Sequence, residues 1–182
     1  MRLFISVSFD ELEAAIAEVQ TPLRELPGLR TTDPANAHVT LKFLGEGDHN
    51  HDALSEAIEK AVETAAVGPF TVTLEGVGAF PSPEYIRVVW LGVGNGTEAV
   101  GELHRELEAE TTALGYEAER HEFTPHVTLA RMEHAAAKAD VQEFLETRDP
   151  EIGPVSVEAL RLKESTLSAD APEYRTIAEF GL

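Results

Sequence analysis

The tetrapeptide His-Val-Thr-Leu occurs twice in this chain, and the repeat limits the possible folds more than any other feature of the sequence. One copy begins at His38 and the other at His126, about half of the 182-residue chain apart. Successive side chains of a β-strand point to opposite faces, so His and Thr share one face while Val and Leu share the other. Each copy therefore predicts a strand with one reactive polar face and one apolar face that packs in a core.

Hydrophobic periodicity predicts the elements around these two strands. A first helix is expected after Asp10, with apolar residues at Leu12, Ile16, Val19 and Leu23 and an end by Pro27-Gly28; further helices are expected over residues 52–66, 97–114 and 135–145. Asp10 is expected to cap the first helix, and Pro22 is expected to kink it or to end it early. The two repeats lie in strands expected over residues 38–44 and 123–130. Further strands are expected over residues 3–9, 70–74, 86–93, 155–167 and 174–180. The Gly and Pro residues of segment 76–83 predict a turn or an irregular crossing.

The order of these elements predicts the fold class. The second half of the chain repeats the rough order of the first half, which favours an α+β domain of two pseudo-symmetric lobes. Each lobe is expected to be a mainly antiparallel sheet backed by helices, and residues 1–182 are expected to form a single bilobal domain. Pseudo-twofold symmetry would bring the two repeated strands face to face across a central cleft.

The charge of the chain limits how it can meet its partners. With 33 acidic and 14 basic residues, the net charge is -19. Acid excess with few lysines is typical of proteins adapted to high intracellular salt, where screening makes such charge tolerable. An ordinary acidic protein is the alternative interpretation. In either case the overall charge does not attract a polyanion, so an RNA partner would have to be held by local groups.

Cysteine is absent, which excludes disulfides, thiolate catalysis and cysteine-based zinc sites. No stretch approaches the ~18 consecutive apolar residues of a membrane span. We interpret the apolar start of the chain as a first strand and not as a signal peptide, because acidic residues follow at once. The expectation is a cytoplasmic protein without a membrane partner; the oligomeric state stays open, with a monomer favoured.

Two histidines on facing strands suit the opening of a cyclic phosphodiester. That reaction needs a base for the attacking water and an acid for the departing ribose oxygen, and imidazole serves as either near neutral pH. The hydroxyls of Thr40 and Thr128 are placed to donate to the phosphoryl oxygens as charge develops. Strain in the five-membered ring lowers the barrier, so we expect no metal and no other cofactor.

These motifs resemble those of the 2H phosphoesterases, and within them the RNA 2′,3′-cyclic phosphodiesterases historically called 2′-5′ RNA ligases (LigT-like). The likeness covers nearly the whole chain, including RLFISVSF, HVTLKFLGEG, GVGAFPSPEYIRVVWLGV, FTPHVTLAR and LKESTLSADAPEYRTIAEFGL. The resemblance implies a bilobal α+β fold with the active site in the central cleft. It also implies that His38 donates a proton, that His126 accepts one, that Arg131 helps to hold the phosphate, and that the product carries a 2′-phosphate.

Two aromatic residues are further candidates for contact with the substrate. Phe43 and Phe80 are candidates for stacking on a base, although core packing is favoured for Phe43 and the role of Phe80, expected in a loop, stays open. Trp90 is expected in the core. The remaining histidines are interpreted as bystanders: His49 and His51 in a solvated turn, His104 on a helix edge, and His121 and His134 beside the second motif strand.

Three other functions compete with cyclic phosphate hydrolysis to a 2′-phosphomonoester. ATP-independent 2′-5′ RNA ligation is the reverse reaction, and the chain contains no phosphate-loop pattern that would supply energy. A non-catalytic RNA-end binding module is disfavoured because binding alone would accept Arg or Lys in place of histidine. A metallohydrolase is disfavoured because no carboxylate–histidine ligand set is visible.

Overall fold

The computed structural model describes residues 1–182. Its elements follow the expected order with two differences: a short strand, β2, was not expected, and the single strand expected over residues 155–167 is divided into β7 and β8. The strands are β1 (Arg2–Ser8), β2 (Leu29–Thr31), β3 (His38–Glu46), β4 (Phe70–Ser82), β5 (Tyr85–Val93), β6 (His126–Met132), β7 (Glu151–Val157), β8 (Ala159–Leu167) and β9 (Pro172–Gly181). The α-helices are α1 (Glu13–Gln20), α2 (His51–Ala65), α3 (Thr97–Ala113) and α4 (Lys138–Thr147). Short 3₁₀ turns cover Asp10–Leu12, Thr21–Leu23, Pro34–Asn36 and Ala135–Ala137.

The strands form one antiparallel sheet in the order β7-β4-β5-β6-β3-β1-β8-β9, and β2 pairs with β6. The two repeated tetrapeptides begin β3 and β6, which are neighbours at the centre of this order. They meet through a single residue pair, Val39 with Val127. The sheet therefore consists of two halves that join at the repeat.

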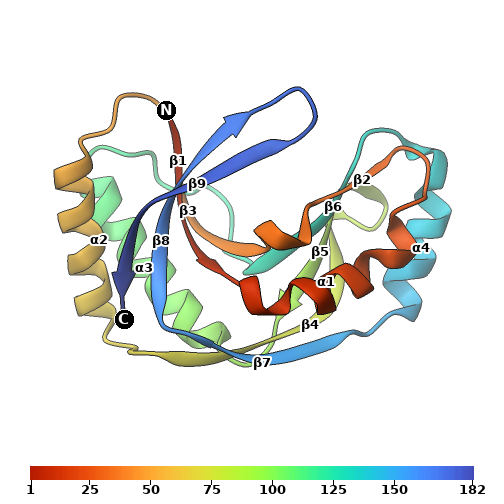
Figure 1. The fold of residues 1–182 in the computed structure, drawn as a ribbon, viewed down its shortest axis with the longest axis horizontal. Helices are drawn as coiled ribbons and strands as arrows, with labels where there is room; N and C mark the ends of the chain where they lie inside the picture. Colours follow the sequence, from red (N-terminus) through yellow and green to blue (C-terminus); the bar gives the residue numbers. More distant parts are fainter.

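Each half of the sheet has its own pair of helices. In Figure 1, α2 and α3 lie at one end of the molecule, beside β3, β1, β8 and β9, while α1 and α4 lie at the other end with β4, β5 and β6. The expected α+β fold of two lobes, each an antiparallel sheet backed by helices, is confirmed. The lobes do not coincide with the halves of the chain, because α1 crosses from β1 to the far lobe and β8–β9 returns to the first.

The apolar residues of the repeat anchor both central strands in the core. Val39, Leu41, Val127 and Leu129 are at most 2% exposed and belong to one continuous apolar cluster that extends through both lobes. Side chains alternate along a strand, so the histidines and threonines of the repeat lie on the opposite face of the sheet. The distribution expected from the sequence is therefore present in both copies.

Segment 76–83 is not the turn that its Gly and Pro content predicted. It continues β4, which pairs with β5 as far as Ser82 and Tyr85. The glycines serve the strand in two ways. Gly76 has a φ of +72° at a register shift, as a β-bulge requires, and a Cβ on Gly78 would collide with the ring of Trp90.

The first helix also differs in detail from the prediction. Asp10 does not cap it, since the carboxylate accepts a hydrogen bond from Arg161 at 2.9 Å instead. Pro22 lies in the 3₁₀ turn that follows the last α-helical residue, Gln20, so the expected early end is confirmed. None of the four α-helices combines the length and the apolar character that a membrane crossing by a helix would require.

One buried ion pair ties β3 to α3. Lys42 is 4% exposed, and its ammonium donates to the carboxylate of Glu108 at 2.8 Å and to the carbonyl of Glu117 at 2.6 Å. Removal of one partner from such a pair leaves the other charge poorly solvated, which costs more stability than the pair itself contributes.

We therefore expect Lys42→Met to lower the free energy of unfolding by ~2–3 kcal/mol, since Glu108 loses its counter-ion. The matched control is Lys60→Met, which removes a lysine from an exposed pair with Glu110 and should cost ~1 kcal/mol or less. Urea titrations of both variants measure the difference. Equal losses in the two variants would contradict a structural role for the buried pair.

Candidate active site

The pairing of Val39 with Val127 sets the geometry of the repeated residues. In an antiparallel pair, continuing this register places His38 beside Thr128 and His126 beside Thr40. The two histidines are then diagonal neighbours, which lie ~7–8 Å apart in a regular ladder. Two imidazoles and two hydroxyls thus surround one position on the same face of the sheet.

Both imidazole rings are held in the same tautomer. Nδ1 of His38 lies 2.7 Å from the carbonyl oxygen of Asn36, and Nδ1 of His126 lies 2.7 Å from that of Thr124. A carbonyl oxygen only accepts, so each Nδ1 carries the proton, and Nε2 of each neutral ring is left as an acceptor. Each histidine is therefore oriented and prepared to take a proton, or to donate one once it is protonated.

Aromatic side chains fix the position of His38. Its ring lies 5.1 Å from the ring of Phe4 on β1 and 5.5 Å from that of Tyr174 on β9, the second contact being edge-on. Phe4 and Tyr174 also contact each other at 5.3 Å. His38 is thus enclosed by two strands of its own lobe.

Aromatic side chains of the other lobe surround His126 in an equivalent way. The ring of Phe80 on β4 meets it edge-on at 4.8 Å, and the indole of Trp90 on β5 lies 6.2 Å away. Phe80 and Trp90 contact each other at 5.2 Å. The indole Nε1 of Trp90 is buried without a hydrogen-bond partner.

Arg131 is a cation whose charge acts on both histidines and on Tyr174. Its positive charge lowers the pKa of His38, of His126 and of Tyr174, which places the guanidinium near both histidines. Arg131 is exposed and forms no hydrogen bond or ion pair, although the chain is rich in carboxylates. Guanidinium binds phosphate oxygens well, so this free charge suits an anionic ligand between the histidines.

Burial holds both histidines in the neutral form. Desolvation is the main cause that lowers the pKa of His38 to about 4; the charges of Lys163, His126 and Arg131 contribute to this lowering, and the hydrogen bond to Asn36 opposes it. Desolvation also lowers the pKa of His126, with a smaller contribution from Arg131. An anion bound between the rings would oppose these effects and favour protonation.

The structure brings together most of the residues that the sequence singled out. His38, His126, Thr40 and Thr128 share one face, and Arg131 lies beside them; neither threonine hydroxyl bonds to another protein group. Phe80 lies on a strand and not in a loop, in contact with His126.

Two expectations of core packing are wrong. Phe43 is 67% exposed and lies 6.4 Å from Phe4, because a register shift in β3 turns it outward. Trp90 is partly exposed beside His126, since Gly78 leaves room for its ring on the face of the sheet that carries the two histidines, called the catalytic face below.

Sequence reasoning missed three side chains of this site: Phe4, Tyr174 and Lys163. Phe4 lies in an apolar run, where only its alternation with Ser6 and Ser8 signals that it faces away from the core. Tyr174 and Lys163 come from the far end of the chain, and no local pattern connects them with His38.

The remaining histidines have structural roles. Nδ1 of His49 bonds to the Tyr116 hydroxyl at 2.9 Å, and its Nε2 lies within 3.0 Å of the Met1 carbonyl oxygen, so it is more than a solvated loop residue. His104 bonds to the carbonyl of Leu41 at 2.7 Å. His134 packs over Gly28, where a Cβ would collide with its ring. None of the three lies with the repeated motifs.

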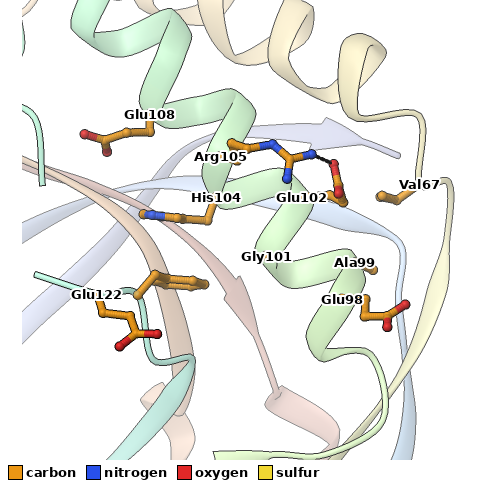
Figure 2. A pocket seen from close by; sticks show the side chains of 10 residues that line it. Val67, Glu98, Ala99, Gly101, Glu102, His104, Arg105, Glu108 and Glu122 are labelled. Atoms are coloured by element: carbon orange, nitrogen blue, oxygen red, sulfur yellow. Dashed lines mark hydrogen bonds and ion pairs between the residues drawn. The ribbon is translucent and has the colours of Figure 1, made fainter.

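A hollow lies along α3 and is separate from the two histidines of the repeat. It has a volume of about 830 Å³ and is lined mainly by α3, with Val67 and the 122–123 segment. Figure 2 shows Glu98, Glu102 and Glu108 along its wall, with Arg105 turned to Glu102. Its acidic lining disfavours an anionic substrate, so we do not place the chemistry there. No group of three or more His, Asp or Glu side chains is arranged to hold a metal ion anywhere in the chain.

A bilobal α+β sheet with one His-x-Thr motif on each central strand defines a two-histidine (2H) phosphoesterase. Residues 8–166 match the family described as the 2'-5' RNA ligase superfamily. The chain therefore belongs to that superfamily.

Relatives of known name extend over most of the chain. A protein of Aeropyrum pernix named RNA 2',3'-cyclic phosphodiesterase is 38% identical over 152 residues, which are 83% of this chain and 85% of that one. A protein of Methanothermobacter thermautotrophicus with the same name is 33% identical over 187 residues, covering 100% of this chain and 99% of the relative.

Solved structures show the same fold. A crystal structure from Thermus thermophilus superposes with a TM-score of 0.78 at 29% identity, covering 100% of this chain and 98% of that one. The structure of E. coli LigT in complex with 3'-AMP gives a TM-score of 0.76 at 24% identity, covering 100% and 97%.

NMR titration tests the neutral state of the two histidines. In the free protein we expect His38 to titrate near pH 4 and His126 below its ordinary pKa of ~6.5. Because these pKa values are lower in the folded state than in the unfolded one, protonation also destabilises the fold as the pH falls below ~6.5. Inorganic phosphate should raise both pKa values. Titration of either ring at or above the value seen in denaturant, without phosphate, would contradict the assigned environment.

Proposed function

We propose that this chain hydrolyses the 2′,3′-cyclic phosphate ends of RNA to 2′-phosphomonoesters. The observation that carries the proposal is the pair of histidines on one face, each with Nδ1 bound to a carbonyl and Nε2 free. The names of the relatives support the substrate, since they are called RNA 2',3'-cyclic phosphodiesterases.

The reaction needs two proton transfers on opposite sides of the phosphorus. Nε2 of His126 accepts a proton from water as the water oxygen forms a bond to phosphorus. Protonated His38 gives its Nε2 proton to the ribose 3′ oxygen as the bond from phosphorus to that oxygen breaks. The product carries the phosphate on the 2′ oxygen. At the end of the reaction His126 has gained one proton and His38 has lost one. The assignment of His38 as the acid follows the family resemblance.

Hydrogen-bond donors stabilise the charge that develops on the non-bridging oxygens. The hydroxyls of Thr40 and Thr128 are free to donate, and the guanidinium of Arg131 is unpaired beside both rings. Binding of the substrate also favours protonation of the acid, His38. Its phosphate anion raises the depressed pKa of His38 on binding, so the proton is taken up when the substrate is in place.

Aromatic side chains offer surfaces on which a nucleobase of the RNA can stack. Phe43 is exposed on the catalytic strand β3, and Phe80 contacts His126 on the other side of the site. Stacking on either ring tolerates any base, as an enzyme acting on varied RNA ends requires.

ATP-independent 2′-5′ ligation is the second candidate, because the family description names a 2'-5' RNA ligase. The same two histidines in the same roles would join a 5′ hydroxyl, in place of water, to the cyclic phosphate: His126 would take the proton of the 5′ hydroxyl, and His38 would protonate the departing 3′ oxygen. Water is far more concentrated than RNA ends, so hydrolysis is the direction that we propose.

Incubation with an oligonucleotide that ends in a 2′,3′-cyclic phosphate tests the function directly. We expect a 2′-phosphate end, resistant to a 3′-phosphate-specific phosphatase. His38→Ala and His126→Ala should each lower kcat by ~10²-fold or more, the usual worth of one acid or base. Thr40→Ala and Thr128→Ala should cost less.

Circular dichroism and a thermal melt establish that each variant is folded. Near wild-type kcat in a folded histidine variant would refute the two-histidine mechanism. A product with a 3′-phosphate would instead reverse the orientation of the substrate, and a joined product would favour ligation.

We also propose that the protein is adapted to high salt. The net charge of -19 in 19.8 kDa creates self-repulsion that dilute buffer does not screen. The repulsion also opposes the approach of RNA, and both effects weaken when molar salt shortens the screening length to ~3 Å.

A salt series measures this adaptation. We expect Tm to rise between low and molar KCl, because repulsion among surface carboxylates is removed. Turnover of the cyclic phosphate should rise or hold steady, in contrast to a basic RNA-binding protein, whose affinity falls steeply with salt. A Tm that is flat or falls over the same series would remove the salt-adapted interpretation and leave the catalytic one standing.

A further inference from the structure

Two lysines of this chain are buried, and only one of them has a partner. Lys42 and Lys163 are 4% and 6% exposed. The ammonium of Lys42 donates to Glu108 and to the carbonyl of Glu117. Lys163 forms no hydrogen bond and no ion pair, and burial lowers its pKa. Its ammonium still reaches solvent, but a charge that burial partly desolvates without a partner is costly, so the fold gains little from this lysine.

The carboxylates nearest to this lysine in the sheet are already neutralised by arginines. Glu164, the next residue in β8, accepts from Arg175 at 2.6 Å. Arg161, two residues earlier, holds both Asp10 at 2.9 Å and Glu179 at 3.2 Å. In a chain with a large excess of acid, the lysine is thus left free for a ligand.

Lys163 lies on the catalytic face, beyond His38. It is opposite Phe4 in the pairing of β8 with β1, and the Phe4 ring contacts His38 at 5.1 Å. β8 lies beside β1 in Figure 1. The charge of Lys163 acts on His38 and not on His126, whereas that of Arg131 acts on both. Arg131 therefore lies over the reacting position, and Lys163 lies on its outer flank.

We propose that Lys163 binds a second phosphate of the RNA, the phosphodiester that joins the terminal nucleotide to its neighbour. Lys163 would then be the residue that distinguishes an RNA chain from a mononucleoside cyclic phosphate. This inference rests on the proposed function, because it assumes that the cyclic phosphate lies between the two histidines.

The spacing of the strands favours the neighbouring phosphate over the reacting one. β1 lies between β3 and β8, so two strand separations of ~4.8 Å place the backbone of β8 ~10 Å from that of β3. Lys163 is also displaced along the strands, since it is opposite Phe4 whereas His38 is opposite Ser8. Arg131 acts on both histidines and Lys163 on His38 alone, so a ligand between the histidines lies nearer to Arg131 than to the lysine. A phosphodiester one nucleotide further along the chain meets the ammonium directly, and an ammonium binds phosphate as a point charge.

Paired substrates test this assignment. Lys163→Met should raise KM for a dinucleotide with a 2′,3′-cyclic phosphate end about tenfold, as expected for loss of one bond to a charged group. KM for the mononucleoside 2′,3′-cyclic phosphate should stay within twofold. Any change in kcat, which would come from the lost charge of Lys163 on His38, should be the same for both substrates. Lys163→Arg should restore most of the preference for the dinucleotide.

Two matched controls separate binding from stability and from net charge. Lys42→Met removes the other buried lysine and should lower Tm, whereas Lys163→Met should leave Tm unchanged or raise it. Lys60→Met changes the net charge equally at an exposed site on α2 and should alter neither KM.

Equilibrium binding gives a readout that does not depend on turnover. In a His126→Ala background, Lys163→Met should weaken the dinucleotide only and should reduce its salt slope by ~0.7. Equal loss for both ligands would mean that Lys163 acts on the reacting phosphate or on His38 and would overturn the proposal, as would no loss for either. Failure of the wild-type protein to turn over either substrate would refute the proposed function, and the binding comparison would still decide the role of Lys163.

Discussion

The active site depends on one antiparallel contact, the pairing of Val39 with Val127. It is the only residue pair that joins β3 to β6, and therefore the only ladder contact between the two halves of the sheet. Both valines are buried in the common core, so a slip of either strand by one residue would expose the valines and leucines and bury the histidines. The apolar half of each motif thus fixes the register that the polar half needs for chemistry. Repetition of the whole tetrapeptide follows from this double requirement.

The symmetry of the backbone does not extend to the side chains around the two histidines. His38 lies among Phe4, Tyr174 and Lys163, while His126 lies against Phe80 and Trp90. The cationic neighbour adds to the desolvation that lowers the pKa of His38. In the proposed mechanism His38 is the acid, and its low pKa would make it a strong acid once the substrate's anion has favoured its protonation, which suits donation to a poor leaving group. Different environments can therefore assign different roles to two identical motifs.

Much of this site could be predicted from the sequence, because it is encoded locally. Alternation within four residues places His38 and Thr40 on one face, and the second copy repeats the argument. The side chains that surround the two histidines could not be predicted in this way. Phe80 and Trp90 reach His126 only because a bulge at Gly76 and the open space over Gly78 keep a Gly-rich segment in the sheet. Tyr174 and Lys163 depend on β8 and β9 returning to the first lobe, a long-range pairing that no local pattern reports.

Unpaired cations near the two histidines explain how a chain with so large a negative charge can bind an anion. Around Lys163, carboxylates are neutralised by arginines, as in the pairs of Arg161 with Asp10 and Arg175 with Glu164. On the catalytic face, Arg131 and Lys163 have no such partner. Repulsion by distant carboxylates is screened within a Debye length, whereas a cation in contact with a phosphate is screened little. For the proposed substrate, the net charge would therefore limit the rate of encounter at low salt, while the two unpaired cations would determine the affinity at contact.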